Sequence, residues 1–232
     1  MNAILLAAGY GTRLRPVTDS TPKCLVKIKN EPLLNIWLKK LSSVGVEKIL
    51  INTHHLSDHV EKFVKRSIHV KKLQLVNEKK LLGTAGTLIK NISFFNGEDG
   101  FLIHADNYCL EDLNILISAH KNRPADCLMT MLTYETPNYS SCGIVKTDER
   151  GIVKNFYEKN NNNFGNIANG AVYILSSKLI EIIQNEFIHA KDFTKDIVEN
   201  LLGKIYTYKT SKFFTDIGTY KEYERANNFI SN

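Results

Sequence analysis

The chain has 232 residues, of which 43% are hydrophobic and 23% are charged. These proportions match those of folded soluble proteins and exclude a disordered or fibrous chain. Thirty Lys and Arg against 24 Asp and Glu give a formal net charge of +6. Because the basic residues are scattered and no nucleic-acid-binding motif accompanies them, we expect no nucleic acid partner.

The length suits one large α/β domain or two small ones, and we expect a single domain over residues 1–232. The apolar run over residues 3–8 is too short to cross a membrane, and no basic residue precedes it as in a signal peptide. We therefore expect a cytoplasmic protein with no membrane partner. The four cysteines lack C-x-x-C spacing, which predicts reduced, mostly packing thiols.

The first half of the chain alternates apolar runs with amphipathic stretches, which predicts strands and helices around a parallel sheet. Residues 2–8 are almost continuously apolar, as in a central strand that is buried on both faces. Ser57 is expected to cap the second helix. The predicted elements are strand 2–8, helix 32–44 with Gly45 as its stop, strand 48–53, helix 57–66, strand 72–77 and strand 100–105.

The second half breaks this alternation with three strand-like runs over residues 125–134, 143–147 and 152–158. Short connections, including residues 148–151, predict a hairpin inserted into the sheet. The asparagine-rich residues 160–163 are predicted to form a mobile loop. The remaining predicted elements are strand 171–175, helices 176–184 and 192–202, strands 204–208 and 213–216, and helix 219–229. The pattern predicts a Rossmann-like, three-layer αβα fold with a mostly parallel central sheet.

The most informative segment is the string LAAGYGTRLRP at residues 6–16, followed by Pro22-Lys23. Two glycines after a buried strand let backbone N–H groups approach a phosphate, while Arg13 and Lys23 supply positive charge. A bare G-x-G is also common in ordinary tight turns. The string lacks the third glycine of a dinucleotide fingerprint, and it does not match a Walker loop.

The complete string with Pro22-Lys23 resembles the signature of the sugar-1-phosphate nucleotidyltransferases. The LGTAG sequence at residues 82–86 is similar to the family's nucleobase loop, in the wording of mannose-1-phosphate and heptose-1-phosphate guanylyltransferases. The sequences at residues 103–106, 142–145, 158–159, 169–170 and 214–219 resemble further family motifs in the family's order. The resemblance therefore covers nearly the whole chain and implies the nucleotidyltransferase fold.

This resemblance implies roles for individual residues, with nucleotide bound by about residues 1–110 and sugar phosphate by about 111–232. The implied catalytic residues are Arg13, Lys23, Asp106 and Asp216, the two aspartates also being the ligands of Mg²⁺. The implied nucleotide-binding residues are Leu6, Ala8, Gly9, Gly11, Thr12, Arg13, Lys23, Glu78, Gly83 and Thr84. The implied substrate-binding residues are Asn107, Gly143, Glu158, Lys159, Asn169 and Gly170.

The chemistry of nucleotidyl transfer agrees with these roles. A phosphate oxygen of one anion attacks the α-phosphorus of another, so the site needs cations and alignment more than a base. The attacking phosphate is already ionised, so we expect no covalent intermediate. Magnesium prefers one or two carboxylates together with substrate oxygens, which two aspartates such as Asp106 and Asp216 could supply.

Several alternatives remain open from the sequence. GTP and a mannose-type or heptose-type sugar 1-phosphate are the preferred substrates, but UTP, dTTP or CTP with another sugar phosphate is also compatible. Residues 104–108, HADNY, also resemble phosphocholine cytidylyltransferases. An inactive nucleotide-binding regulatory subunit is the third alternative, and a homo-oligomer is possible. The family often continues Glu-Lys with proline, whereas Asn160 follows here.

We interpret His54, His55 and His59 as structural or surface residues, because no acidic third ligand lies nearby.

Overall fold

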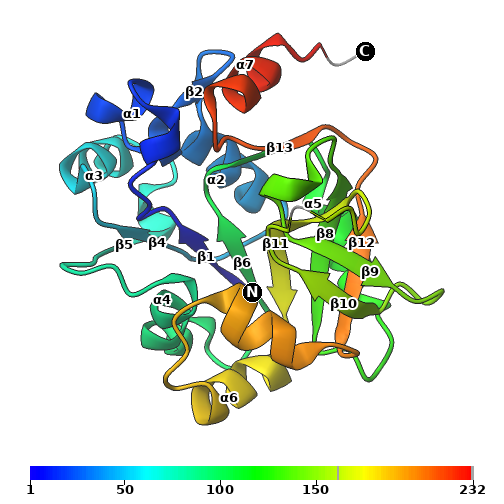
Figure 1. The fold of residues 1–232 in the computed structure, drawn as a ribbon. Helices are drawn as coiled ribbons and strands as arrows, with labels where there is room; N and C mark the ends of the chain where they lie inside the picture. Colours follow the sequence, from blue (N-terminus) through cyan, green and yellow to red (C-terminus); the bar gives the residue numbers. More distant parts are fainter. Residues whose placement is uncertain (161, 231–232) are drawn as a thin grey trace.

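Four parallel strands form one half of the sheet in a computed structural model, which describes residues 1–160 and 162–230 (Figure 1). Their order is β5-β4-β1-β6, and all three pairings are parallel. The strand bounds are β1 (Asn2–Leu6), β4 (Ile49–Thr53), β5 (Leu73–Asn77) and β6 (Gly100–His104). The position of β1 between two neighbours confirms the prediction that its apolar sequence belongs to an inner strand.

The second half of the chain extends the same sheet mainly with antiparallel strands. Strand β11 pairs antiparallel with β6, β8 and β9, while β12 pairs parallel with β8. Strands β9 and β10 form the predicted hairpin. The bounds are β8 (Met129–Glu135), β9 (Ile144–Thr147), β10 (Val153–Tyr157), β11 (Ile167–Leu175) and β12 (Ile205–Lys209). The α/β class with a mostly parallel central sheet and an inserted hairpin is thus confirmed.

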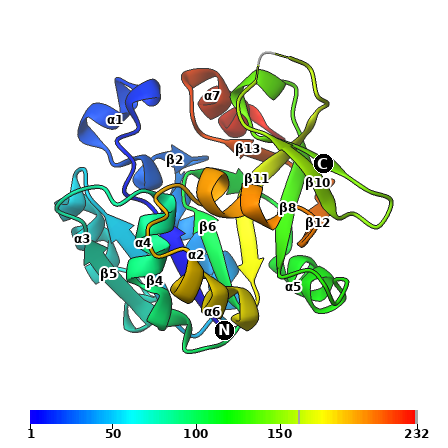
Figure 2. The same ribbon diagram turned by 60° about the horizontal axis from the view of Figure 1, so that its bottom comes forward.

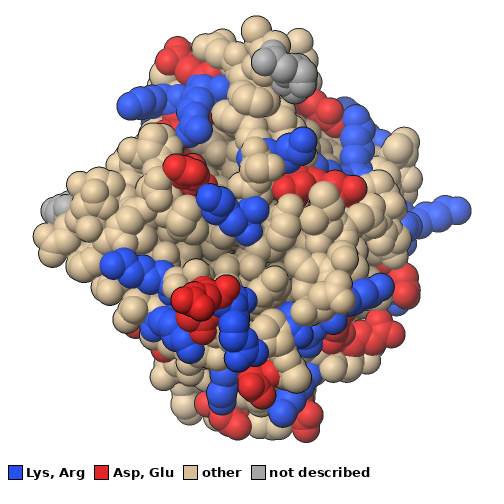
Figure 3. Space-filling view, turned by 90° about the vertical axis from the view of Figure 1, so that its right-hand side faces the viewer, with Lys and Arg blue, Asp and Glu red and all other residues tan. Residues whose placement is uncertain are grey.

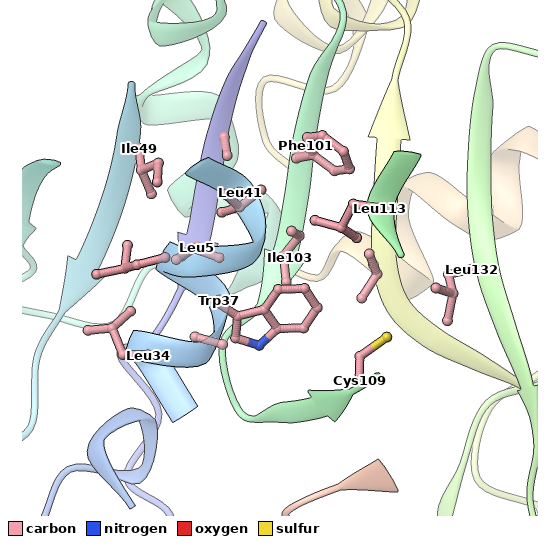
Figure 4. Packing of buried hydrophobic residues seen from close by; sticks show 14 of the residues in the cluster. Leu5, Leu34, Trp37, Leu41, Ile49, Phe101, Ile103, Cys109, Leu113 and Leu132 are labelled. Atoms are coloured by element: carbon pink, nitrogen blue, oxygen red, sulfur yellow. The ribbon is translucent and has the colours of Figure 1, made fainter. Parts of the chain in front are cut away.

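Helices cover both faces of the sheet (Figures 1 and 2). Alternate residues of β1 point to opposite faces, so Leu5 packs with Trp37 of α2 while Ile4 packs with Leu88 of α4. Figure 4 shows Trp37 and Leu41 of α2 against the face of the sheet that carries Leu5. The helix bounds are α2 (Leu33–Ser43), α3 (Ser57–Lys65), α4 (Thr84–Lys90), α5 (Leu113–Lys121), α6 (Ser177–Glu186) and α7 (Tyr220–Asn228).

A short antiparallel pair outside the main sheet joins the middle of the chain to its C-terminal part. Strand β7 (Asn107–Cys109) pairs with β13 (Phe214–Asp216), so Asn107 lies opposite Asp216. A small core of Leu14, Ile217 and Ala226 also holds the glycine-loop region against the last helix. This arrangement brings Asp106 and Asp216, which are far apart in the sequence, to one end of the parallel strands.

Several predicted boundaries were wrong for identifiable reasons. The first strand ends at Leu6 rather than at residue 8, because the Ala7 N–H donates to the Asn52 side chain (2.7 Å). Helix α3 already begins at Ser57, and Leu56, with φ +52°, takes the capping position expected for Ser57. The predicted helix 192–202 consists of a π-helix (Phe193–Val198) and a 3₁₀ turn (Glu199–Leu201).

Further details concern the surface and the cysteines. Asn161, in the predicted mobile loop 160–163, lies outside the described residues. On the face in Figure 3, Lys and Arg side chains lie among Asp and Glu side chains. Within residues 1–160 and 162–230, all four cysteines are free, and no helix is long and apolar enough to cross a membrane.

Candidate active site

Two adjoining cavities open at the carboxyl ends of the parallel strands, where ligands bind in open α/β sheets. The first cavity has a volume of about 230 Å³ and the second about 200 Å³. His104 and Asp106 line both of them. Predicted residues on the first cavity are Leu6, Ala8, Gly9, Glu78, Gly83, Thr84 and Asp106. Predicted residues on the second are Arg13, Asp106, Asn107, Gly143, Glu158, Lys159, Asn169 and Asp216.

The glycine loop after β1 presents unpaired backbone donors. Within the described residues, no N–H group of residues 8–13 donates to a protein acceptor. Gly11 has φ +66°, and its carbonyl accepts a hydrogen bond from Thr18 Oγ1 (2.8 Å). A Cβ on Gly11 would lie 3.0 Å from Thr18 Cγ2 and 3.3 Å from Lys23 Cβ, which explains the need for glycine. Gly11 and Thr12 lie in this loop beside the cavities. A run of free N–H groups is suited to binding an anion.

A lysine and two aspartates form the charged centre of the site. Lys23 is almost fully buried, and its Nζ lies 2.5 Å from Asp106 Oδ2 and 3.3 Å from Asp216 Oδ1. Arg13 approaches Asp216 from the glycine loop, with 3.9 Å between Nη2 and Oδ2. All four residues predicted to be catalytic therefore meet at one place, although they come from three distant segments of the chain.

The electrostatic environment separates the two aspartates. Burial opposes the charged form of Asp106, but Lys23, His104 and a backbone hydrogen bond together outweigh burial and hold the pKa of Asp106 below its usual value. Burial and the neighbouring Asp106 charge raise the pKa of Asp216 above its usual value. Burial would lower the pKa of Lys23, but the two carboxylates raise it instead. The site thus holds two carboxylates that one lysine only partly compensates.

The donor set at this centre fits a magnesium ion that is shared with substrates. The repulsion that raises the pKa of Asp216 is the kind that a divalent cation relieves. Within the described residues, no group of three or more His, Cys, Asp and Glu could hold a metal ion. Asp106 and Asp216 could therefore supply only part of a coordination shell, which is typical of magnesium bound together with phosphates.

The loop before α4 is held against the segment before the π-helix. Lys191 O accepts a hydrogen bond from Ala85 N (3.0 Å), and Thr84 Oγ1 accepts one from Phe193 N (2.7 Å). A Cβ on Gly83 would lie only 2.3 Å from Lys191 O, so no other residue fits there without a shift. These contacts fix the rim of the first cavity from the C-terminal half of the chain.

A buried polar network supports this rim from below. Glu78 is 2% exposed, and its carboxylate accepts hydrogen bonds from Asn52 Nδ2 (2.9 Å), Thr87 Oγ1 (2.5 Å) and Leu82 N (3.1 Å). Asn52 in turn accepts from Ala7 N, which ties the network to the glycine loop. The Glu78 carboxylate therefore accepts hydrogen bonds from protein donors of β4, α4 and the loop before α4, and it links these segments at the first cavity.

The predicted sugar-side residues form the second cavity and its supports. Asn107 and Gly170 bond to each other, since Asn107 Nδ2 donates to Gly170 O (2.8 Å). Asn169 N donates to Gly143 O (2.9 Å), and Asn169 Nδ2 lies 2.6 Å from the Tyr173 hydroxyl. The Lys159 ammonium is mostly exposed, 3.6 Å from Glu158 Oε1. Gly170 is the one predicted sugar-side residue that supports the cavity without lining it.

Sequence reasoning missed several residues that line the cavities. Asn52 could have been found, because it is a polar residue inside the apolar strand 49–53. No role was implied for the others, because they converge only in the folded chain, although His104, Cys142 and Phe214 lie within sequences that resemble family motifs. These other residues are Leu81, Thr87 and His104 on the first cavity, and His104, Tyr134, Ser141, Cys142, Ala171, Thr194 and Phe214 on the second.

Comparison with known proteins defines the class. The Nucleotidyl transferase family model matches residues 2–232, and the chain therefore belongs to this family. A mannose-1-phosphate guanylyltransferase catalytic subunit beta from Drosophila melanogaster is 31% identical over 229 residues, which cover 95% of this chain and 60% of that protein. The chain thus spans about 60% of the length of these relatives.

Two further relatives match over nearly their full length. The D-glycero-alpha-D-manno-heptose 1-phosphate guanylyltransferase from Aneurinibacillus thermoaerophilus is 28% identical, with 97% of this chain and 96% of that protein covered. The crystal structure of HddC from Yersinia pseudotuberculosis complexed with GMP-PN superimposes with a TM-score of 0.80 at 26% identity and covers 97% of each chain.

Proposed function

We propose that this protein is a Mg²⁺-dependent guanylyltransferase that joins GTP to a sugar 1-phosphate, giving a GDP-sugar and pyrophosphate. The observation that carries the proposal is the meeting of Arg13, Lys23, Asp106 and Asp216 where two cavities adjoin. A reaction between two anions needs two binding sites and positive charge at their junction. The two adjoining cavities are proposed to provide these two sites.

The first cavity is the proposed nucleotide site. The free N–H groups of the glycine loop and the guanidinium of Arg13, which lines the adjoining second cavity, are proposed to bind the β- and γ-phosphates, and Lys23, which contacts Asp106, is proposed to contact the α-phosphate. Leu6, Glu78, Gly83 and Thr84 surround the remaining space, in which the base and ribose are proposed to bind. Guanine is preferred because the relatives from Drosophila melanogaster and Aneurinibacillus thermoaerophilus are named as guanylyltransferases.

The second cavity is the proposed site of the sugar phosphate. Glu158, Asn107 and Asn169 supply polar atoms for sugar hydroxyls, and the Lys159 ammonium is available for the phosphate. A mannose-type or heptose-type sugar is proposed because these two relatives are named for mannose 1-phosphate and a heptose 1-phosphate. In this arrangement about residues 1–110 supply the nucleotide site, and about residues 111–232 supply most of the sugar-phosphate site, to which Asn107 also contributes.

In the proposed reaction, an oxygen of the sugar phosphate attacks the α-phosphorus, a new P–O bond forms, and the bond to the β-phosphate breaks. Asp106 and Asp216 would hold Mg²⁺, which supplies neutralisation of the phosphate oxygens. Lys23 and Arg13 stabilise the charge that moves onto the departing pyrophosphate. No residue needs to act as a nucleophile, because the sugar phosphate is already ionised.

The proposal also includes a cytoplasmic location, no nucleic acid or membrane partner, and a possible homo-oligomer. The location is supported by the substrates, since nucleoside triphosphates and sugar phosphates are supplied in the cytoplasm. The relatives' names refer to small sugar phosphates as substrates.

Pyrophosphate release tests the proposal. GTP, ATP, UTP, CTP and dTTP are each paired with mannose 1-phosphate, a heptose 1-phosphate, other sugar 1-phosphates or phosphocholine in the presence of Mg²⁺. We expect release with GTP and a mannose-type or heptose-type phosphate, and its loss in Asp106→Ala. Release with CTP and phosphocholine instead would contradict the proposed substrates. Silence of a folded, triphosphate-binding protein across the panel would favour the regulatory alternative.

A further inference from the structure

His104 lies at the boundary between the two cavities. It is the last residue of β6, and among the described residues only His104 and Asp106 line both cavities. Asp106 already belongs to the charged centre through Lys23. His104 lies within the sequence at residues 103–106 that resembles a family motif, but that resemblance implied no role for its side chain. Its position raises the question of what an imidazole does where two phosphorylated substrates would meet.

The sheet register shows how His104 reaches this boundary. Leu6 of β1 pairs with Asn52 of β4 on one side and with His104 of β6 on the other. Residues in register on neighbouring parallel strands point to the same face of the sheet. Leu6 and Asn52 line the first cavity, so the same row continues through His104 into the second. Leu6 and Asn52 line the first cavity alone, and His104 is the member of the row that also lines the second.

The hydrogen bonding of His104 differs from that of the polar residues around it. Asn52 is bonded to Glu78 and Ala7, and Lys23 is bonded to both aspartates. Among residues 1–160 and 162–230, the His104 side chain has no hydrogen-bond partner. An imidazole always carries at least one N–H donor. A half-buried donor that faces a cavity and lacks a protein acceptor is suited to an acceptor on a ligand.

We propose that His104 is a substrate-contacting residue. Its imidazole N–H donates a hydrogen bond to an oxygen of the α-phosphate, which lies between the two substrates when the sugar phosphate attacks. This inference rests on the proposed function and adds a residue to it. At the boundary, the contact is available only to a group that lies between the two substrates. An oxygen of the α-phosphate gains negative charge as the nucleotidyl group is transferred, so the hydrogen bond from His104 strengthens in the transition state.

Two substitutions at His104 test this role. His104→Leu removes the donor while keeping an apolar side chain, and His104→Gln keeps an N–H donor on a side chain of similar reach. Loss of a hydrogen bond to a charged oxygen predicts about a 10- to 100-fold lower kcat for His104→Leu. We expect GTP binding measured by calorimetry to change less than about twofold, and His104→Gln to recover most of kcat. His59→Leu, at an exposed position on α3, is the matched control and should behave as wild type.

The outcomes separate this inference from the proposed function. An active wild type with an equally active His104→Leu would overturn the role of His104 alone. Equal losses of kcat in His104→Leu and His104→Gln, together with lower melting temperatures, would assign His104 a structural role and also overturn the inference. A raised KM with unchanged kcat would contradict a contact that strengthens in the transition state. A wild type that is silent with every substrate pair would overturn the proposed function and, with it, this inference.

Discussion

Lys23 Nζ lies 3.3 Å from Asp216 Oδ1, although the two residues are 193 positions apart in the chain. The same ammonium lies 2.5 Å from Asp106, so one buried lysine joins the end of β6 to the end of β13. The carboxylates of Asp106 and Asp216, which share this one ammonium group, would repel each other without it. The pairing makes the first and last parts of the chain mutually dependent components of one site.

Lys23→Gln should lower kcat for pyrophosphate release about 100-fold or more, because it removes a preorganised positive charge next to the transferred phosphate. The measurement is steady-state kinetics with GTP and the preferred sugar phosphate. Lys27→Gln is the matched control, since Lys27 is exposed only four residues further along the chain. Comparable kinetics for the two variants would show that the Lys23 charge does not assist the reaction.

Removal of the Asp106 charge should lower the pKa of Asp216, because Asp106 is a neighbouring negative charge that raises it. The pKa of Asp216 can be followed by carbon NMR titration of metal-free wild type and Asp106→Asn. An unchanged or higher value in the variant would contradict the electrostatic coupling of the two carboxylates.

Removal of the metal should abolish activity, because Asp106 and Asp216 are proposed to hold Mg²⁺ between them. We expect chelation by EDTA to stop pyrophosphate release and added Mg²⁺ to restore it. Asp106→Asn and Asp216→Asn should each lose about 100-fold in rate and need more Mg²⁺. Asp126→Asn, at an exposed position, serves as the control. Full activity in EDTA would exclude the metal role.

Gly83→Ala should weaken GTP binding at least about tenfold, because its Cβ would meet Lys191 O at 2.3 Å and displace the rim of the first cavity. Gly97→Ala is a close control, since Gly97 has a similar positive φ (+72° against +79°) but nothing within 4 Å of its Cβ. Gly97→Ala should lose about 1 kcal/mol of stability because of its positive φ, and Gly83→Ala should lose more, because its φ of +79° and ψ of 170° belong to a region almost restricted to glycine. Only Gly83→Ala should change the Kd measured by calorimetry. An equal effect of both substitutions would attribute the loss to backbone strain.

The stability of the fold should fall in acid because of His120. Its side chain is 1% exposed and contacts Thr130 and Asp99. Burial lowers the pKa of His120 from 6.5 to about 4. Between these pH values the unfolded chain binds a proton that the folded chain does not, so the free energy of unfolding decreases as pH falls. The shift corresponds to about 3 kcal/mol.

Urea unfolding of wild type and His120→Gln at pH 7 and pH 4.5 measures this contribution. Between the two pH values, the wild type should lose about 2 to 3 kcal/mol more than the variant. Parallel losses in both proteins would show that His120 is not responsible.

The sequence predicted the parts of the fold that depend on local patterns. The continuous apolar run of β1, the hairpin through residues 148–151 and the strands of the parallel half follow from residue type and spacing. Helices α4 and α5 were missed, and Asp192 was placed inside a helix that it caps. Caps and short helices depend on individual hydrogen bonds, such as those from Thr194 N and Lys195 N to Asp192, which periodicity does not reveal.

The candidate site shows the same division. Arg13, Lys23, Asp106 and Asp216 were predicted because each belongs to a motif with a recognisable resemblance. Their convergence depends on the pairing of β7 with β13, a contact between distant segments. The resemblance at residues 103–106 implied no role for His104, and Thr194 carries no motif, so their places at the cavities follow only from the folded chain.

Oxygen labelling directly tests the proposed attack of the sugar phosphate on the α-phosphorus of GTP. Mannose 1-phosphate carrying ¹⁸O in its phosphate group is incubated with GTP, Mg²⁺ and the protein, and the products are examined by mass spectrometry, with the heptose phosphate in a parallel reaction. If the sugar phosphate attacks in this way, we expect a GDP-sugar that keeps the whole label and a pyrophosphate that contains none. Labelled pyrophosphate, or GMP formed without any GDP-sugar, would contradict the attack of the sugar phosphate on the α-phosphorus.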